Sequence, residues 1–409
     1  MMHAGTDEGA DGLMSHYFSN VTVFDGRTVK TKQGVHVAGG TIEWIGPHAR
    51  APRIARAASE VDGTGRTLTP GLIDCHVHLS FDGGADFAGE AVGLTQATAA
   101  IKAARNASRH LAHGVTTVRD LGGVYSAICD VARAVDEGIV PGPRILAAGR
   151  ALTVTGGHGH NLALAREVDG PDDVRQAVRE EIKAGARAIK VMATGGVLTP
   201  GIDATFTAFT PEELVAAVDE AHKWGRGVAA HAIGAEGAWN AVVAGVDSVE
   251  HCVQVNAALA AEMKARGTFR SPTLCAIRGI LDNADEVPEY AVAKAAALEA
   301  EGKDSFRRAV RAGVRHVCGT DAGTPFNPHG NAPHELVYMV QWGMTPLKAM
   351  QAATANGAEL LRLPLVGTID EGNEADLVLF DGNPAEAIEH VASPLMVLKA
   401  GDVVAGTLA

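Results

Sequence analysis

Residues 71–79 read GLIDCHVHL and follow directly after Pro70. Apolar residues dominate this stretch, which predicts a buried strand that starts after the Pro-Gly pair. Side chains alternate across a strand, so His76 and His78 project to the same side, about 6 to 7 Å apart along the strand. Two imidazoles placed in this way can share one metal ion, although one or both could equally be core histidines.

Between residues 70 and 362, apolar strand candidates alternate with amphipathic helical segments, such as 171–183 and 211–223 with Thr210 as the N-cap. The strand candidates are residues 72–79, 115–120, 144–149, 188–193, 227–232, 247–252, 268–274 and 315–320. This alternation predicts an α/β fold of the (β/α)8 TIM barrel type. A doubly wound open sheet is the alternative, but no GxGxxG motif follows an early strand.

The two ends of the chain have a different residue pattern, with short β-like runs separated by Asp-Gly and Gly-Gly turns. We expect residues 17–69 and 363–409 to join into one small β-sandwich domain beside the catalytic barrel of residues 70–362. Residues 1–16 are polar and rich in glycine, which predicts a flexible tail.

The chain has 35 lysines and arginines and 48 aspartates and glutamates, so its formal net charge is 35 − 48 = −13 and the protein is acidic. This charge argues against a nucleic acid or an anionic membrane as partner and leaves small molecules as the expected partners. No apolar run of about 18 residues and no signal peptide pattern is present, which predicts a cytoplasmic protein that could form homo-oligomers. The five cysteines are scattered without CxxC spacing, which predicts reduced, buried thiols.

Chemistry in a TIM barrel collects at the carboxyl ends of the strands. Taken singly, the polar residues at the predicted strand ends have structural explanations: Lys190 as a salt-bridging lysine, His231 as a core imidazole and Asp321 as a turn residue. Together they predict a shared metal site. Its candidate ligands are His76, His78, Lys190, His231, His251 and Asp321.

Several stretches in the same order resemble the amidohydrolase superfamily along nearly the whole chain. They are TPGLIDCHVHL, GVTTVRDLGG, AIKVMATGGV, AAHAIG, VEHC, GTDAG, MTPLKAMQAATANGAELL and GTIDEGNEADLVLFDGNP. Within the superfamily, the chain is most similar to the imidazolonepropionase-like branch that contains Xaa-Pro dipeptidases (prolidases) and metallo-carboxypeptidases. Lys190 separates it from imidazolonepropionase itself, which has no metal-bridging lysine at the fourth strand.

The resemblance implies two divalent metal ions, with Zn²⁺ as the expected metal. His76, His78 and Asp321 would bind one ion, and His231 and His251 the other. Lys190 would bridge both as a carbamate, because an ammonium beside two dications is strongly disfavoured. If Lys190 were an unmodified structural lysine, the site would hold a single ion.

The resemblance also implies the chemistry, in which a hydroxide bridging the two ions attacks an amide carbonyl. Asp321 would act as the catalytic base and then as the acid that protonates the leaving nitrogen. In the TGGHG segment, His158 is the first candidate for a catalytic contact with a substrate oxygen. His160 and Arg278 are further substrate-binding candidates, with loop-capping and surface roles as their alternatives, and His329 and Asn331 could line the pocket mouth.

Two function classes follow. The favoured one is a binuclear metallohydrolase that cleaves the amide bond of dipeptides, with Xaa-Pro as the leading substrate class. Other C-terminal residues, N-acyl amino acids, cyclic amides and aromatic amide toxins stay open as substrates. The other class is a catalytically inactive relative that serves as a scaffold, but such relatives typically lack metal ligands, and here all six positions are filled.

Overall fold

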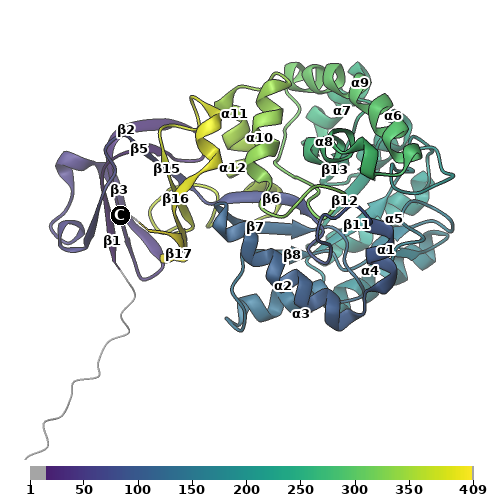
Figure 1. Cartoon of the computed structure of the whole chain (residues 1–409), viewed down its shortest axis with the longest axis horizontal. Coiled ribbons are helices and arrows are strands. Elements are labelled where there is room, and N and C mark those ends of the chain that lie inside the picture. Colours follow the sequence, from purple (N-terminus) through teal and green to yellow (C-terminus); the bar gives the residue numbers. More distant parts are fainter. Residues whose placement is uncertain (1–14, 408–409) are drawn as a thin grey trace, which may run out of the picture.

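The chain folds into a β-sheet part and a larger α/β part, which lie side by side (Figure 1). The structure, a computed structural model, describes residues 15–407. The predicted tail of residues 1–16 lies mostly outside this range, and its last residue, His16, already begins a strand. Within the described range, no helix is long and apolar enough to cross a membrane.

Strands from both ends of the chain form one eight-stranded sheet in the order β17-β16-β15-β5-β1-β2-β3, with β4 paired to β1. A two-sheet sandwich was expected here and is not observed. The reason is that β5 pairs with β1 along one edge and with β15 along the other, so the N-terminal and C-terminal strands share a single ladder. The strands are β1 (His16–Phe24), β2 (Val29–Ala38), β3 (Thr41–Pro47), β4 (Ser59–Asp62), β5 (Arg66–Pro70), β15 (Leu377–Asp381), β16 (Pro394–Lys399) and β17 (Asp402–Gly406).

The α/β part contains two parallel sheets, one in the order β6-β7-β8 and one in the order β10-β9-β11-β12-β13-β14. Seven of the eight predicted strands are present, and β9 and β10 were not predicted. The strands are β6 (Leu72–Val77), β7 (Val115–Asp120), β8 (Arg144–Ala147), β9 (Ala151–Thr153), β10 (Ala165–Glu167), β11 (Ala188–Met192), β12 (Gly227–Ala232), β13 (Ser248–His251) and β14 (Phe269–Ser271).

These strands do not form one closed sheet, so the expected closed eight-stranded barrel is not observed. The predicted strand 315–320 is not a regular strand; it makes isolated backbone hydrogen bonds to Arg270 of β14 and to Cys75 of β6. On the other side, Gly149 with φ +71° interrupts the chain between β8 and β9. The backbone thus joins the two sheets by single hydrogen bonds instead of continuous ladders.

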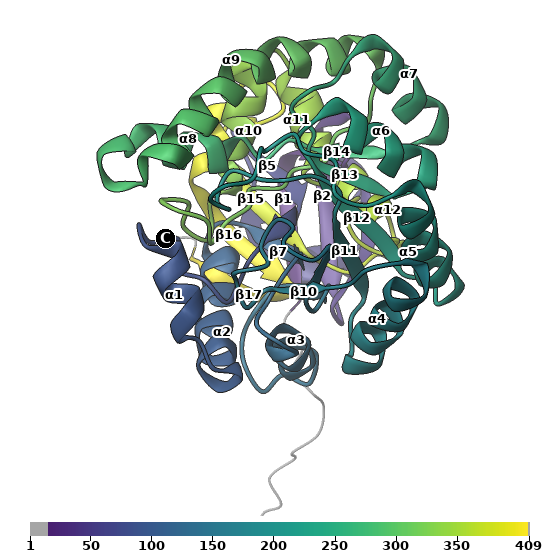
Figure 2. The same ribbon diagram turned by 90° about the vertical axis from the view of Figure 1, so that its right-hand side faces the viewer.

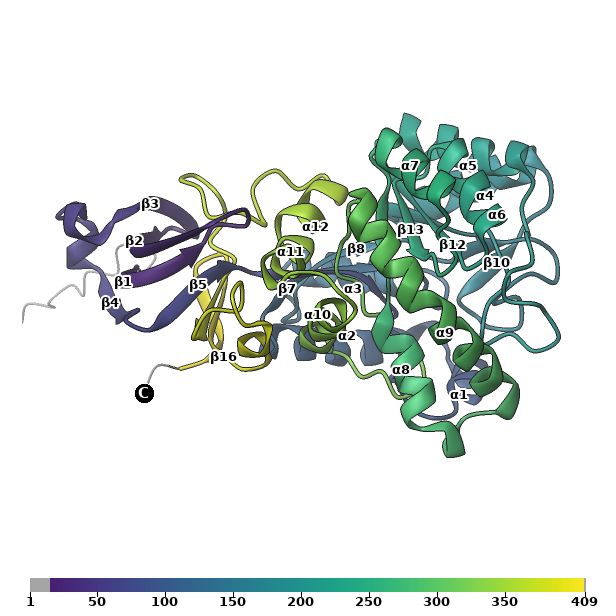
Figure 3. The same cartoon turned by 90° about the horizontal axis from the view of Figure 1, so that it is seen from above.

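Helices α2 to α9 lie around the outside of these strands (Figure 2). Helices α10 to α12 lie between the parallel strands of the α/β part and the eight-stranded sheet (Figure 3). The α-helices are α1 (Phe87–Gly93), α2 (Gln96–Ala112), α3 (Ala127–Asp136), α4 (Pro171–Ala184), α5 (Pro211–Lys223), α6 (Ala235–Ala244), α7 (Ala257–Arg266), α8 (Leu274–Asp282), α9 (Glu289–Ala312), α10 (Ala332–Gln341), α11 (Pro346–Ala352) and α12 (Ala355–Leu360). Single 3-10 turns are η1 (His48–Arg50), η2 (Ala55–Ala57), η3 (Ala284–Glu286) and η4 (Ile388–Ala392).

The start of α5 illustrates how local sequence fixes a helix end. The Thr210 hydroxyl accepts a hydrogen bond from the Glu213 amide, and the Glu213 carboxylate accepts one from the Thr210 amide. This capping box satisfies two backbone donors that would otherwise lack a partner at the helix end. The predicted N-cap is confirmed.

All five cysteines are buried and free of disulfides, as predicted. Burial raises the pKa of the Cys75 and Cys275 thiols far above that of a free cysteine. The neutral thiols therefore act as small apolar side chains in the core.

A buried histidine pair joins α2 to the loop that precedes α10. His329 Nε2 donates to the Phe81 carbonyl at 2.7 Å, so its Nδ1 accepts a hydrogen bond from His110 Nε2, 3.1 Å away. Burial lowers the pKa of His329 to about 4 and that of His110 well below its usual value. Both rings are therefore neutral at pH 7.

This pair predicts a loss of stability in mild acid. The folded-state pKa values of the two histidines lie below the unfolded value of about 6.5. Their contribution to the free energy of unfolding is therefore complete above pH 6.5 and is lost as the pH falls toward 4. From His329 alone, we expect a loss of about 2 kcal/mol in the free energy of unfolding between pH 7 and pH 5. In urea unfolding, His329→Gln should show a weaker dependence on pH than the parent protein over this interval.

The exposed His334→Gln provides the matched control, because its side chain lies on the surface of α10. The change in the free energy of unfolding between pH 7 and pH 5 is compared between the two variants and the parent, so the titration of all other histidines cancels. An identical pH slope for the parent and for His329→Gln would contradict the prediction.

Candidate active site

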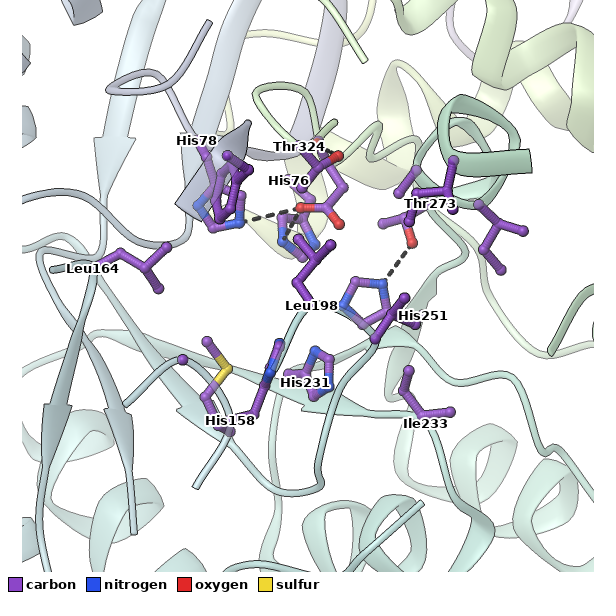
Figure 4. Close-up of a pocket in the computed structure, with 18 of the residues that line it drawn as sticks. His76, His78, His158, Leu164, Leu198, His231, Ile233, His251, Thr273 and Thr324 are labelled. Carbon is purple, nitrogen blue, oxygen red and sulfur yellow. Dashed lines mark hydrogen bonds and ion pairs between the residues drawn. The ribbon is translucent and has the colours of Figure 1, made fainter. Parts of the chain in front are cut away.

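Polar side chains from separate strands and loops converge on one pocket (Figure 4). They lie at the carboxyl ends of β6, β11, β12 and β13 and in the segment that follows residue 320. The six candidate ligands His76, His78, Lys190, His231, His251 and Asp321 all line this pocket, and so does His158. The structure thus brings together residues that lie up to 245 positions apart, 321 − 76 = 245.

His76, His78 and Asp321 form the tightest group in the pocket. Oδ1 of Asp321 lies 3.3 Å from His76 Nε2 and 3.1 Å from His78 Nε2. One donor atom from each of the three residues lies within 4.8 Å of the others, which suits a single divalent ion. Burial opposes ionisation of Asp321, but the contacts with His76 and His78 outweigh it and lower the pKa of the carboxyl.

His231 and His251 lie next to this group, with ring centroids 4.6 Å apart. His231 Nε2 donates to the Gly195 carbonyl at 2.7 Å, so its Nδ1 carries the lone pair. His251 Nδ1 lies 2.6 Å from the Thr273 hydroxyl, which leaves Nε2 as the ring nitrogen that can bind a metal ion (Figure 4). Burial lowers the pKa of both rings well below the usual value, and neutral imidazoles are the form that binds metals.

Lys190 projects from β11 and is 1% exposed. Burial lowers the pKa of its amine to about 8, while Glu250 and Asp321 favour the charged form. The neutral amine is the form that can react with CO2. Among residues 15–407 no ion pair involves Lys190, so the salt-bridge alternative is not observed, and the side chain lines the same pocket as the candidate ligands.

Three residues that line this pocket have a strained backbone. His251, Thr273 and Asp321 have φ values of 64°, 51° and 61°, in the left-handed region that non-glycine residues rarely occupy. Such conformations cost about 1 to 3 kcal/mol each and persist where the surrounding structure imposes them. The surrounding structure therefore holds two candidate metal ligands and Thr273, which bonds to one of them, in this conformation.

A second layer of polar groups, which the sequence analysis did not identify, orients His76. The fully buried Glu250 accepts from His76 Nδ1 at 2.9 Å, from Arg119 at 2.9 Å and from Ser248 at 2.5 Å. A carboxylate only accepts, so His76 carries its proton on Nδ1 and its Nε2 lone pair, which lies on the side of the ring that faces Asp321, is free for a metal ion. An acidic residue directly before His251 in an apolar strand was the available signal.

Glu250→Gln is expected to weaken metal binding at His76 by about 10- to 100-fold, as is usual for loss of a group that orients a ligand. The glutamine amide no longer enforces one tautomer and leaves Arg119 without its charge partner. Competition with a chromogenic chelator measures the dissociation constant. The exposed Glu236→Gln serves as control, and equal constants for the two variants would contradict the prediction.

His158 lies in the loop after β9 and packs against His231, with ring centroids 4.5 Å apart. Burial lowers its pKa to about 4. The Thr199 hydroxyl accepts from the Gly159 amide at 3.0 Å and lies 2.7 Å from His158 Nδ1. If the hydroxyl donates its own proton to Nδ1, then Nε2 carries the ring proton and can donate to a substrate oxygen.

Apart from Thr273 and Thr324, the remaining wall of the pocket is apolar. Among the described residues, no arginine lines it. The apolar lining comprises Phe87, Leu162, Leu164, Met192, Val197, Leu198, Ile233, Val253, Ala276, Ile277, Ile280 and Leu298. Apolar surface around a few polar groups is typical of small-molecule sites.

Two predicted substrate-binding residues do not lie at the pocket. His160 is exposed, and its Nδ1 donates to the Gly157 carbonyl at 2.8 Å, which is the loop-capping alternative. Arg278 forms ion pairs with Asp282 and Glu299 on α8 and α9 and lines a different cavity. Its guanidinium is already neutralised, so it is not placed to bind a substrate carboxylate.

The two loop residues expected at the pocket mouth are also absent from the lining. His329 belongs to the buried pair with His110. Asn331 precedes α10 and donates to the Asn327 side chain at 2.9 Å. Both residues hold the loop after residue 321 in place.

The family model of the amidohydrolases matches residues 67–404, and the chain belongs to this family of hydrolases. It is 34% identical over 386 residues to an ochratoxinase of Aspergillus niger, covering 87% of this chain and 78% of the relative. A Xaa-Pro dipeptidase with methionine bound in its active site aligns with a TM-score of 0.87 and 33% identity, over 95% of this chain and 99% of the other. A prolidase complexed with N-methylphosphonate-L-proline aligns with a TM-score of 0.85 and 32% identity, over 95% of this chain and 99% of the other. The resemblance inferred from the motifs is confirmed.

Proposed function

We propose that the protein uses two divalent metal ions, expected to be Zn²⁺, to hydrolyse the amide bond of dipeptides, with Xaa-Pro as the favoured class. The observation that carries this proposal is the convergence of four imidazoles, one carboxylate and one buried lysine on a single pocket. A scaffold protein would have no need to hold these groups together at strained backbone positions.

The ligands divide into two groups by their positions. His76, His78 and Asp321 would hold one ion. His231 through Nδ1 and His251 through Nε2 would hold the other, because their opposite ring nitrogens are already bound to the Gly195 carbonyl and the Thr273 hydroxyl. Lys190, once carboxylated, would contact both ions.

When bound, the two ions would lower the pKa of a water molecule to about 7 and polarise the amide carbonyl. Asp321, held as a carboxylate, accepts a proton from the attacking water and delivers it to the leaving nitrogen. A carbon–oxygen bond forms, the carbon–nitrogen bond breaks, and a carboxylic acid and an amine are released. His158 donates from Nε2 to an oxygen of the substrate and fixes its position.

The Xaa-Pro class is supported by the similarity to the Xaa-Pro dipeptidase and to the prolidase, both above 30% identity. A specific observation favours a second class, N-acyl amino acids with a large apolar acyl group. The pocket wall is apolar and contains no arginine among the described residues, so the substrate would gain affinity chiefly from apolar contact.

The test is a hydrolysis screen of the zinc-reconstituted protein against L-Xaa-L-Pro dipeptides, other dipeptides and N-acyl amino acids. We expect hydrolysis of Xaa-Pro with apolar Xaa, lost on chelation and restored by Zn²⁺. Activity only on N-acyl amino acids would replace the first class by the second. No hydrolysis of any amide by protein with two bound ions would reject the proposal.

A further inference from the structure

The loop of residues 195–203, which follows β11, forms part of the pocket wall. Val197 and Leu198 line the pocket, and Leu198 projects into it near His158 and His231 (Figure 4). Thr199 bonds to His158 Nδ1 at 2.7 Å. This loop therefore touches both the space for the substrate and the side chain expected to contact its oxygen.

The loop also packs directly on the His158 ring. A Cβ added to Gly196 would lie 2.3 to 2.5 Å from three atoms of that ring, closer than any real contact. Only glycine at this position lets the loop backbone approach so closely. Any displacement of the loop would change the position of His158.

The loop has little support of its own. Its ends are held by the bridge between Thr194 and Thr207 and by the Gly195 amide, which donates to the Phe206 carbonyl. Within the described part of the chain, no backbone-to-backbone hydrogen bond engages residues 196–202. The side chains of Val197 and Leu198 pack against apolar residues of α8 and α9, but the backbone carbonyls of the loop need polar partners from elsewhere.

Lys294 of α9 supplies that support. Its ammonium donates to three carbonyls of the loop, those of Gly196, Thr199 and Ile202, at 3.2, 2.9 and 2.7 Å. One turn earlier, the Tyr290 hydroxyl donates to the Leu198 carbonyl at 3.2 Å. An ammonium has three protons, and here all three are used by the loop, so Lys294 is not free to bind a substrate carboxylate.

We propose that Lys294 is a positioning residue that clamps the 195–203 loop onto the pocket and, through Thr199 and Gly196, holds His158 against the substrate. Because Leu198 and Val197 belong to the same loop, Lys294 also sets the fit of apolar substrate groups. This inference rests on the proposed function for its kinetic consequences, but the clamp itself is measurable without catalysis.

Lys294→Met removes the three donors and keeps the length of the side chain. We expect amide hydrogen exchange in residues 195–203 to accelerate by about tenfold or more, most clearly at the Gly195 amide that bonds to the Phe206 carbonyl, because three hydrogen bonds from a charged group are lost. For the best amide substrate, KM should rise and kcat should fall, while the number of bound metal ions stays unchanged. Lys303→Met, exposed on the same helix, should match the parent in all three measurements.

Thr199→Val separates the effect of Lys294 on the loop from its effect on His158. It removes the bond to His158 but leaves the Lys294 bonds to the backbone, so kcat should fall without faster exchange in the loop. In the double variant, the fall in kcat should be smaller than the product of the two single effects, because Lys294 acts on His158 partly through Thr199. A loss of folded protein alone would lower apparent kcat and leave KM unchanged.

Unchanged exchange in residues 195–203 of Lys294→Met would overturn the clamp, whatever the activity. Faster exchange with unchanged KM and kcat would overturn its role in positioning. If Lys294→Met does not fold, Tyr290→Phe and Lys294→Arg carry the same comparison, with partial loosening expected for each. A parent protein without amidase activity would reject the proposed function while the exchange measurement still tests the clamp.

Discussion

Asp321→Asn is expected to lower kcat by about 10²- to 10⁴-fold, the range in which a general acid or base contributes, while KM changes only a few-fold. Asparagine keeps an oxygen that can contact His76 and His78, but it cannot accept a proton from the attacking water or return one to the leaving nitrogen. The carboxyl of Asp321 is ionised in the folded protein, because its contacts with the two imidazoles lower its pKa. Steady-state kinetics on the best amide substrate measures both constants.

The metal content of Asp321→Asn should be determined in parallel, because Asp321 also belongs to the His76 and His78 ligand group. A variant that retains both ions and loses turnover separates proton transfer from metal binding. Asp304→Asn, on the exposed face of α9, is the matched control. Full turnover by Asp321→Asn with both ions bound would remove Asp321 from the proposed mechanism.

Lys190→Met is expected to reduce the bound metal from two ions per chain to one or none, and kcat by about 10³-fold or more. The reason is that a carbamate supplies two anionic oxygens, whereas the thioether of methionine supplies no anion to a site with two dications. Lys190 is buried and can only be replaced by a side chain of similar volume without opening a cavity, which is why methionine is the variant of choice. Metal analysis of dialysed protein gives the stoichiometry.

Carboxylation of Lys190 has a readout of its own. Protein prepared with labelled CO2 should give a carbamate carbon signal that is absent from Lys190→Met and present in the exposed Lys183→Met. Two ions bound by Lys190→Met, or no carbamate signal in the active parent, would contradict the bridging role. The second result would favour the alternative in which the site holds a single ion.

The sequence by itself determined the features that depend on neighbours along the chain. Strand alternation puts His76 and His78 on one side of β6, and Thr210 with Glu213 fixes the start of α5. The order of the motifs identified the amidohydrolase family and named six residues that do line one pocket. These inferences succeed because strand pleat, helix capping and motif spacing are local properties.

Only the tertiary structure decided which groups far apart in sequence become partners. It joined Glu250 to His76 across 174 residues and Lys294 to the carbonyls of the 195–203 loop, and it directed Arg278 to Asp282 and Glu299, away from the pocket. It also left the predicted strand 315–320 irregular and merged the terminal strands into one sheet. Such partnerships follow from long-range packing and from the need of each buried charge for a partner, which no local pattern of residues specifies.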